Sequence, residues 1–244
     1  WLIEIARNMG SRFTFHPALD WTPVWSPDGA RIVFASPREG PESLYQKVSS
    51  GAGNEELLLK TGSRIYANDW SRDGRHFLYS APDAKTRQDL WVLPLDGDRK
   101  PKLYLQTEFD ETQGQFSPDG KFVAYSSNES GRYEVYVQPF PASGGKWMIS
   151  SGGGVQPRWR RDGKEIFYID TGRKLMAAEV KTSPQFQAAV PKPLFDTRIP
   201  PGGNFVFRYA ADASGQRFLM NTTAEETASA PMTVVLNWTS GVKR

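Results

Sequence analysis

A repeated pentapeptide constrains the fold of this chain more than any other sequence feature. Its copies are Trp25-Ser26-Pro27-Asp28-Gly29, Trp70-Ser71-Arg72-Asp73-Gly74, Phe116-Ser117-Pro118-Asp119-Gly120, Trp159-Arg160-Arg161-Asp162-Gly163 and the degenerate Ala211-Asp212-Ala213-Ser214-Gly215. We call the first residue of each copy its anchor. Successive glycines lie 45, 46, 43 and 52 residues apart, and a period of this length is typical of a unit of four β-strands.

The residues after each glycine repeat as well. Positions three, four and five are apolar in every copy, as in Ile32, Val33 and Phe34, which predicts a strand buried on both faces. Two more strands recur after it, the first at Leu44-Tyr45, Leu90-Trp91, Val135-Tyr136 and Leu175-Met176, and the second around 57–59, 103–105, 147–149 and 193–195. With the strand that leads into each anchor, every repeat has four strands.

Four-stranded antiparallel units in series are the blades of a β-propeller, in which each blade buries its faces against its neighbours. Helical repeats would place apolar residues three and four apart, whereas here Asp-Gly hairpin signals separate short alternating runs. The 22 glycines and 18 prolines, together with 13% aromatic residues, also favour many short strands joined by tight turns. The sequence therefore predicts an all-β chain that forms one propeller domain over residues 1–244.

The first residues are expected to form only part of a blade. The segment 1–5 matches the segment 91–95, which belongs to the strand after the post-glycine strand, but the chain begins within that strand. Residues 1–20 are therefore interpreted as a partial blade with 13–15 as its outer strand. In the final repeat, 233–236 is expected to be the third strand. Five anchored repeats and a partial blade predict an N-terminally truncated propeller with six blades when intact. A five-bladed ring closed by residues 12–15 is the alternative.

The repeated Asp-Gly pairs are interpreted as structural turns. Aspartate accepts hydrogen bonds from nearby backbone amides, and glycine adopts positive φ without a Cβ clash. A calcium loop would need further ligand positions that do not follow. The predicted turn residues are Asp28, Gly29, Asp73, Gly74, Asp119, Gly120, Asp162 and Gly163. The aromatic anchors Trp25, Trp70, Phe116 and Trp159 are expected to be wedges between blades.

The sequence contains none of the reactive motifs that we sought. It has no Gly-x-Ser-x-Gly elbow, and its glycine pairs near 51 and 144 lack the rest of a dinucleotide or phosphate loop. The two histidines, His16 and His76, are a whole repeat apart, and there is no cysteine, so no histidine or thiolate metal site is expected. We predict no catalytic residue, no metal and no cofactor.

Composition excludes two classes of partner. The net charge is only +3 despite a pI near 9.0, too little for a strong nucleic-acid field. No apolar run approaches the roughly 18 residues that cross a bilayer, so this segment itself is expected to contact neither nucleic acid nor membrane. The absence of cysteine leaves the compartment open, and the oligomeric state is not predicted.

Candidate binding residues lie on the strands that enter the anchors. In a propeller the inner strands converge on one axial funnel, and loops gathered at one mouth can present side chains from several blades together. Solvent exposure or hydrogen bonding between blades is an equally good interpretation of these residues. The candidates are Asp20, Trp21, Thr22, Asn68, Asp69, Gln113, Gln115, Gln156 and Arg158.

Longer strings resemble known propellers. The strings WSPDGARIVFAS, FSPDGKFVAYSSNESGRYEVYVQPFP and WRRDGKEIFYI are similar to the TolB-like, WD-related repeats of bacterial proteins. ESGRYEVYVQPFP, GGGVQPRWRRDGKEIFY, VPKPLF and PMTVVLNW resemble in particular the propeller that follows the catalytic domain in some bacterial serine/threonine kinases. The kinase ATP loop, His-Arg-Asp and Asp-Phe-Gly motifs are missing, so the resemblance implies the attached propeller alone.

These observations predict a noncatalytic sensor or interaction propeller that binds a protein or peptide at its axial mouth. An extracytoplasmic location is favoured over a cytoplasmic one. The alternative is a propeller enzyme, a hydrolase or lyase with its site in the axial funnel, or the gating propeller of a peptidase. Three or more ionisable residues converging at the axis would favour the enzyme, whereas scattered polar groups would favour binding.

Overall fold

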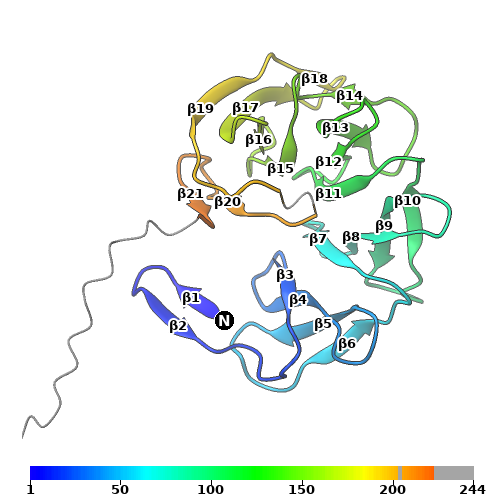
Figure 1. Ribbon diagram of the computed structural model, residues 1–244, viewed down its shortest axis with the longest axis vertical. Coiled ribbons are helices and arrows are strands. Elements are labelled where there is room, and N and C mark those ends of the chain that lie inside the picture. The colour runs from blue at the N-terminus through cyan, green and yellow to red at the C-terminus, as the bar shows by residue number, and fades with distance from the viewer. Residues whose placement is uncertain (203–204, 223–244) are drawn as a thin grey trace, which may run out of the picture.

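The computed structural model describes residues 1–202 and 205–222, and every regular element in these two ranges is a β-strand. The strands form sheets that are arranged around a common centre (Figure 1). This is the predicted β-propeller. Within the described ranges no helix is long and apolar enough to cross a membrane. The predicted strand at 233–236 lies outside the described residues.

Four sheets are complete blades. Blade 1 contains β3 (Trp21–Trp25), β4 (Arg31–Ser36), β5 (Ser43–Val48) and β6 (Glu56–Leu59). Blade 2 contains β7 (Tyr66–Trp70), β8 (His76–Pro82), β9 (Gln88–Pro94) and β10 (Lys102–Leu105). Blade 3 contains β11 (Glu111–Phe116), β12 (Phe122–Ser127), β13 (Glu134–Pro139) and β14 (Trp147–Met148). Blade 4 contains β15 (Val155–Trp159), β16 (Glu165–Ile169), β17 (Lys174–Lys181), β18 (Gln187–Ala188) and β19 (Lys192–Asp196), with both β18 and β19 paired to β17.

Two shorter sheets flank these blades. They are the hairpin of β1 (Leu2–Glu4) with β2 (Met9–Ser11), and that of β20 (Tyr209–Ala211) with β21 (Phe218–Met220). In each blade the strand that leads into the anchor is innermost, and β3, β7, β11, β15 and β20 surround the axis (Figure 1). The post-glycine strand is second, and the two later strands that we predicted follow outward in order.

The core lies between the sheets, as strands buried on both faces require. Ile32 and Phe34 of β4 pack toward Phe13, whereas Val33 and Ala35 pack against blade 2. The same alternation repeats at the later blades because successive strand side chains point to opposite faces. Every complete blade thus shares apolar surface with both of its neighbours.

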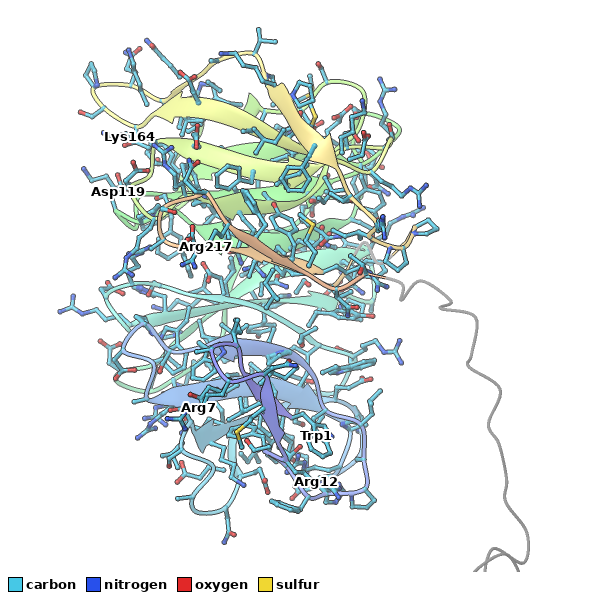
Figure 2. All side chains as sticks on the ribbon, turned by 90° about the vertical axis from the view of Figure 1, so that its left-hand side faces the viewer. Trp1, Arg7, Arg12, Asp119, Lys164 and Arg217 are labelled. Carbon is cyan, nitrogen blue, oxygen red and sulfur yellow. The ribbon has the colours of Figure 1, made fainter. Side chains whose placement is uncertain are left out.

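The Asp-Gly pairs lie in the turns between the first and second strands. In blade 1, Asp28 Oδ1 accepts hydrogen bonds from Ser26 Oγ at 2.6 Å and from Ala30 N at 3.0 Å, and Gly29 has a φ of 72°. Blades 2 and 3 repeat this arrangement. These turns lie on one face of the ring, which we call the turn face, where Figure 2 shows Asp119, Lys164 and Arg217.

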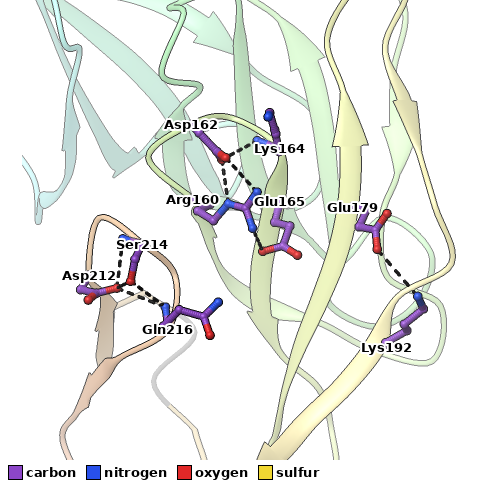
Figure 3. A network of polar contacts seen from close by, with 9 residues as sticks. All are labelled: Arg160, Asp162, Lys164, Glu165, Glu179, Lys192, Asp212, Ser214 and Gln216. Carbon is purple, nitrogen blue, oxygen red and sulfur yellow. Dashed lines mark hydrogen bonds and ion pairs between the residues drawn. The ribbon is translucent and has the colours of Figure 1, made fainter.

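Blade 4 builds its turn differently, because Arg160 stands where the other three have serine. Its Nε and Nη2 donate to the two oxygens of Asp162 at 2.7 and 2.8 Å, while Nη1 reaches Glu165 at 2.6 Å (Figure 3). This guanidinium supplies charged hydrogen bonds in place of the serine hydroxyl and holds the pKa of Asp162 down at about 2.

Two local predictions near the N-terminus are wrong. The outer strand expected at 13–15 is instead β2, because backbone hydrogen bonds from Arg7 N to Glu4 O and from Asn8 N to Ile5 O turn the chain back early. Trp25 is not a wedge but is 53% exposed. The sheet before it is only the β1–β2 hairpin, so a groove of about 790 Å³ is left beside Trp25.

Candidate binding site at the ring axis

The innermost strands share a bulge three residues before the anchor. Strand register shifts there in blades 1, 3 and 4, and Thr22, Gln113 and Gln156 have φ of 46°, 56° and 60°. Positive φ is uncommon for residues other than glycine, and for β-branched threonine it is strained. The bulge turns these three side chains from the regular strand pattern toward the next blade.

Each bulged side chain accepts a hydrogen bond from the backbone of the following blade. Ala67 N donates to Thr22 Oγ1 at 3.2 Å. Gln156 N donates to Gln113 Oε1 at 2.8 Å, and Arg208 N donates to Gln156 Oε1 at 2.6 Å. Blade 2 has Ala67 at this position, and the neighbouring Asn68 accepts instead, from Gly114 N at 3.4 Å.

A second layer of contacts lies one residue before the anchors. Asp69 Oδ2 accepts a hydrogen bond from Phe116 N at 2.8 Å. Gln115 Nε2 donates to Asn68 O at 2.9 Å, and its Oε1 accepts from Arg158 Nη1, also at 2.9 Å. These half-buried or buried side chains link blades 2, 3 and 4 around the axis. Hydrogen bonding between blades, which the sequence left open, is therefore part of their role.

Four ionisable groups interact at the turn-face end of the axis. Burial raises the pKa of Asp69 to about 6, against the opposing effects of the Phe116 amide and the Arg158 charge. Burial also lowers the pKa of Arg158, although Asp69 acts against this change. Arg72 belongs to the same group, because burial and then the Arg161 charge lower its pKa, whereas Asp69 raises it. The Asp69 carboxyl group thus interacts with the guanidinium groups of Arg158 and Arg72, and Arg161 acts on Arg72.

Two of the side chains that link the innermost strands carry a buried donor without a partner in the described part of the chain, Asn68 Nδ2 and Arg158 Nε. An unsatisfied buried donor costs about 1–3 kcal/mol. Their neighbours on the same side chains, Asn68 Oδ1 and Arg158 Nη1, are already bonded across blades. A carbonyl or carboxylate oxygen would satisfy either remaining atom.

Two predicted candidates are not brought into this group. Asp20 pairs with Arg38 Nη2 at 2.7 Å, and Arg38 in turn pairs with Glu55 at 3.4 Å on the side of blade 1. The centres of the Trp21 and Tyr66 rings are 6.0 Å apart, and the guanidinium of Arg64 lies 5.0 Å from the centre of the Trp21 ring. The axial set therefore comprises Thr22, Asn68, Asp69, Gln113, Gln115, Gln156 and Arg158.

Sequence reasoning missed the segment 205–208, which contacts this set. Gln113 Nε2 donates to Val206 O at 2.8 Å, and the Arg158 guanidinium lies 3.8 Å from the centre of the Phe207 ring. A signal existed in the spacing, because the last two glycines are 52 residues apart and the others 43 to 46. The additional residues fall largely in the connection that contains this segment.

The chemistry available at the axis is that of binding. Three or more ionisable groups do converge, which was the feature expected of an enzyme, but three of the four are arginines. Arginine stays protonated in proteins and does not exchange protons as an acid or base. Among residues 1–202 and 205–222 no group of three or more histidine, aspartate or glutamate side chains could hold a metal ion.

Comparison with known proteins places this fold among characterised propellers. No family model matches the chain. Over 111 residues it is 25% identical to the uncharacterized protein Atu1656 of Agrobacterium fabrum, a match that covers 46% of this chain and 37% of that protein. The chain therefore spans little more than a third of that relative.

Solved structures give broader matches. A TolB of Agrobacterium tumefaciens is 18% identical with a TM-score of 0.57, over 68% of this chain and 63% of that one. TolB of Acinetobacter baumannii is 19% identical with a TM-score of 0.60, over 78% and 47%. The Cps50 (Swd1) propeller domain of Myceliophteria thermophila is 12% identical with a TM-score of 0.59, over 80% and 64%. The chain thus has a β-propeller fold similar to that of TolB and Swd1.

Proposed function

We propose that this chain is a noncatalytic propeller that binds a protein or peptide at its axis. The observation that carries the proposal is the pair of unpartnered donors, Asn68 Nδ2 and Arg158 Nε, in the group where Gln113 already donates to a main-chain carbonyl. Carbonyl oxygens recur along every peptide, so a peptide segment supplies the acceptors that this group requires.

The wider context is also part of this proposal. The similarity of the longer strings to kinase-attached and TolB-like propellers supports a place in a bacterial protein of one of those kinds. Likeness to TolB supports an extracytoplasmic location over a cytoplasmic one. An arginine-rich set supports binding over the enzymatic alternative, because Asp69 is its single acid–base group, whereas general acid–base catalysis commonly uses an acid together with a base.

Selection of a displayed random peptide library on the full chain tests the proposal. Peptides enriched on the chain should bind it with a measurable Kd, and Arg158→Lys should weaken them at least tenfold, because lysine keeps the charge but lacks the Nε donor and the planar group. The matched control is Arg217→Lys on the exposed turn face, where the side chain pairs with Asp212; it should change Kd less than twofold.

The proposal is wrong if no peptide is enriched on the folded chain, or if the Arg158 and Arg217 variants bind equally well. Melting temperatures of both variants show whether the fold is kept. Mass spectrometry of the bound peptides tests the enzymatic alternative, since cleavage or elimination products that disappear in Arg158→Lys would support catalysis.

A further inference from the structure

The connection that leads into β20 is longer than those of the complete blades. It runs from residue 197 to 208, whereas the connections into β7, β11 and β15 are 60–65, 106–110 and 149–154. In Figure 1 the chain before β20 reaches the centre of the ring beside β7 and β11. The extra length brings the segment 205–208 to the axis.

Consecutive residues of this segment contact three different blades. The Phe205 ring stacks on Tyr66 of blade 2, with centroids 5.3 Å apart. Val206 O accepts from Gln113 of blade 3, and the Phe207 ring lies against Arg158 of blade 4. Arg208 N then donates to Gln156 Oε1.

The contacts have the pattern by which a protein recognises a short peptide. Two aromatic rings, separated by one residue, stack on a tyrosine ring and on a guanidinium group. The main-chain carbonyl between them accepts a hydrogen bond from a side-chain amide. The segment is not part of a strand ladder, and residues 205–208 are all only half-buried. Few bonds therefore hold it, and groups of the candidate site provide most of them.

We infer that residues 205–207 are an internal stand-in for the partner, which binds by displacing them and itself carries two aromatic residues separated by one. The inference rests on the proposed function and adds the sequence chemistry of the ligand and the contact that limits access. A tethered segment competes at an effective concentration in the millimolar range, so its release should strengthen binding of an added peptide.

The test uses a fluorescein-labelled acetyl-Phe-Val-Phe-Arg-amide peptide and the full chain. The double variant Phe205→Ser with Phe207→Ser removes both rings that compete for the site. It should bind the probe at least tenfold more tightly than the unchanged chain in fluorescence anisotropy. The matched control is Val190→Ser, which also replaces an exposed apolar residue but lies in the connection between β18 and β19; it should leave the affinity unchanged.

A scrambled peptide, acetyl-Val-Arg-Phe-Phe-amide, should bind the double variant at least fivefold more weakly than the probe. Equal binding of the probe to the double variant and the unchanged chain would overturn the inference, as would equal binding of the two peptides. Near-ultraviolet circular dichroism shows whether the double variant is folded.

A second measurement decides the case if that variant does not fold. Millimolar probe added to the unchanged chain should speed hydrogen exchange of the Arg208 amide, because displacement of the segment breaks its bond to Gln156 Oε1. Probe binding that leaves this exchange unaltered would contradict displacement. If library peptides bind in an Arg158-dependent manner while the segment stays protected, the inference fails and the proposed function stands. If no peptide binds at all, both fail.

Discussion

At the scale of single residues, Asp69 shows how the axis combines structure with charge. Its Oδ2 accepts the amide of Phe116 in the next blade, which favours the ionised form, but burial outweighs this effect and the neighbouring arginine and raises the pKa to about 6. The folded chain thus holds a proton on Asp69 at a pH where the unfolded chain has lost it.

This difference makes stability depend on pH in a defined direction. Because the pKa of Asp69 rises from 3.8 to about 6 on folding, its contribution is fully present below about pH 4 and is lost as pH increases through 6. Asp69→Asn keeps an oxygen acceptor for the Phe116 amide but does not titrate. The free energy of unfolding of the unchanged chain, relative to this variant, should fall between pH 4 and 6 by on the order of 1–3 kcal/mol.

Urea unfolding at several pH values measures this difference. Glu111, whose pKa burial raises to about 7, is present in both proteins and cancels in the comparison. A difference in unfolding free energy that is flat between pH 4 and 6 would show that Asp69 ionises normally in the folded chain.

At the scale of elements, the innermost strands depend on close approach between blades. Gly114 lies within the bulge of β11, where a Cβ atom would be 2.5 Å from Leu78 Cδ2 and 3.2 Å from Leu90 Cδ2. The same residue donates its amide to Asn68 Oδ1. A small residue at this point lets blade 3 approach blade 2 closely enough for the hydrogen bonds at the axis to form.

Gly114→Ala should therefore destabilise the chain by about 1–3 kcal/mol through overpacking. Gly62→Ala is the matched control, because its Cβ would meet open space and its φ is not left-handed; it should change stability by less than about 0.5 kcal/mol. Leu78→Ala should lower the free energy of unfolding less in the Gly114→Ala background than in the unchanged chain, because the shorter side chain makes room for the new Cβ atom. Additive losses in chemical denaturation would mean that the contact with Leu78 is not the cause.

At the scale of the whole molecule, the sheets form a nearly one-dimensional stack in which each contacts mainly its neighbours. Blades 2 and 3 have a complete blade on either side, and β8 and β12 are almost entirely buried. The β1–β2 hairpin has only two strands and is largely exposed. Local stability should differ accordingly along the stack.

Amide hydrogen exchange measured by mass spectrometry should show this gradient. The amides paired in β8 and β12 should exchange at least tenfold more slowly than those paired between β1 and β2, corresponding to about 1.4 kcal/mol in the free energy of opening. Protection that is uniform from β1 to β16 would instead show that the ring opens as one cooperative unit.

Much of the fold could be predicted from the repeat. Apolar residues after each glycine, such as Val33 and Phe34, define strands buried on both faces. The two later strands predicted for each of blades 1 to 4 are also present. The strand at 13–15 could not be placed correctly, because its alternative depended on a short turn at 5–8. Likewise, the exposure of Trp25 depends on the size of the neighbouring sheet, which is the two-stranded β1–β2 hairpin.

By itself, the sequence determined the strand order and the turns of each blade, because these follow from local periodicity and from the chemistry of Asp-Gly. Only the tertiary structure decided which candidates meet there, separating Asp20 in its pair with Arg38 from Gln113 and Arg158. Only it placed residues 205–207 among them, because side chains from different blades converge through ring geometry, which local patterns do not encode.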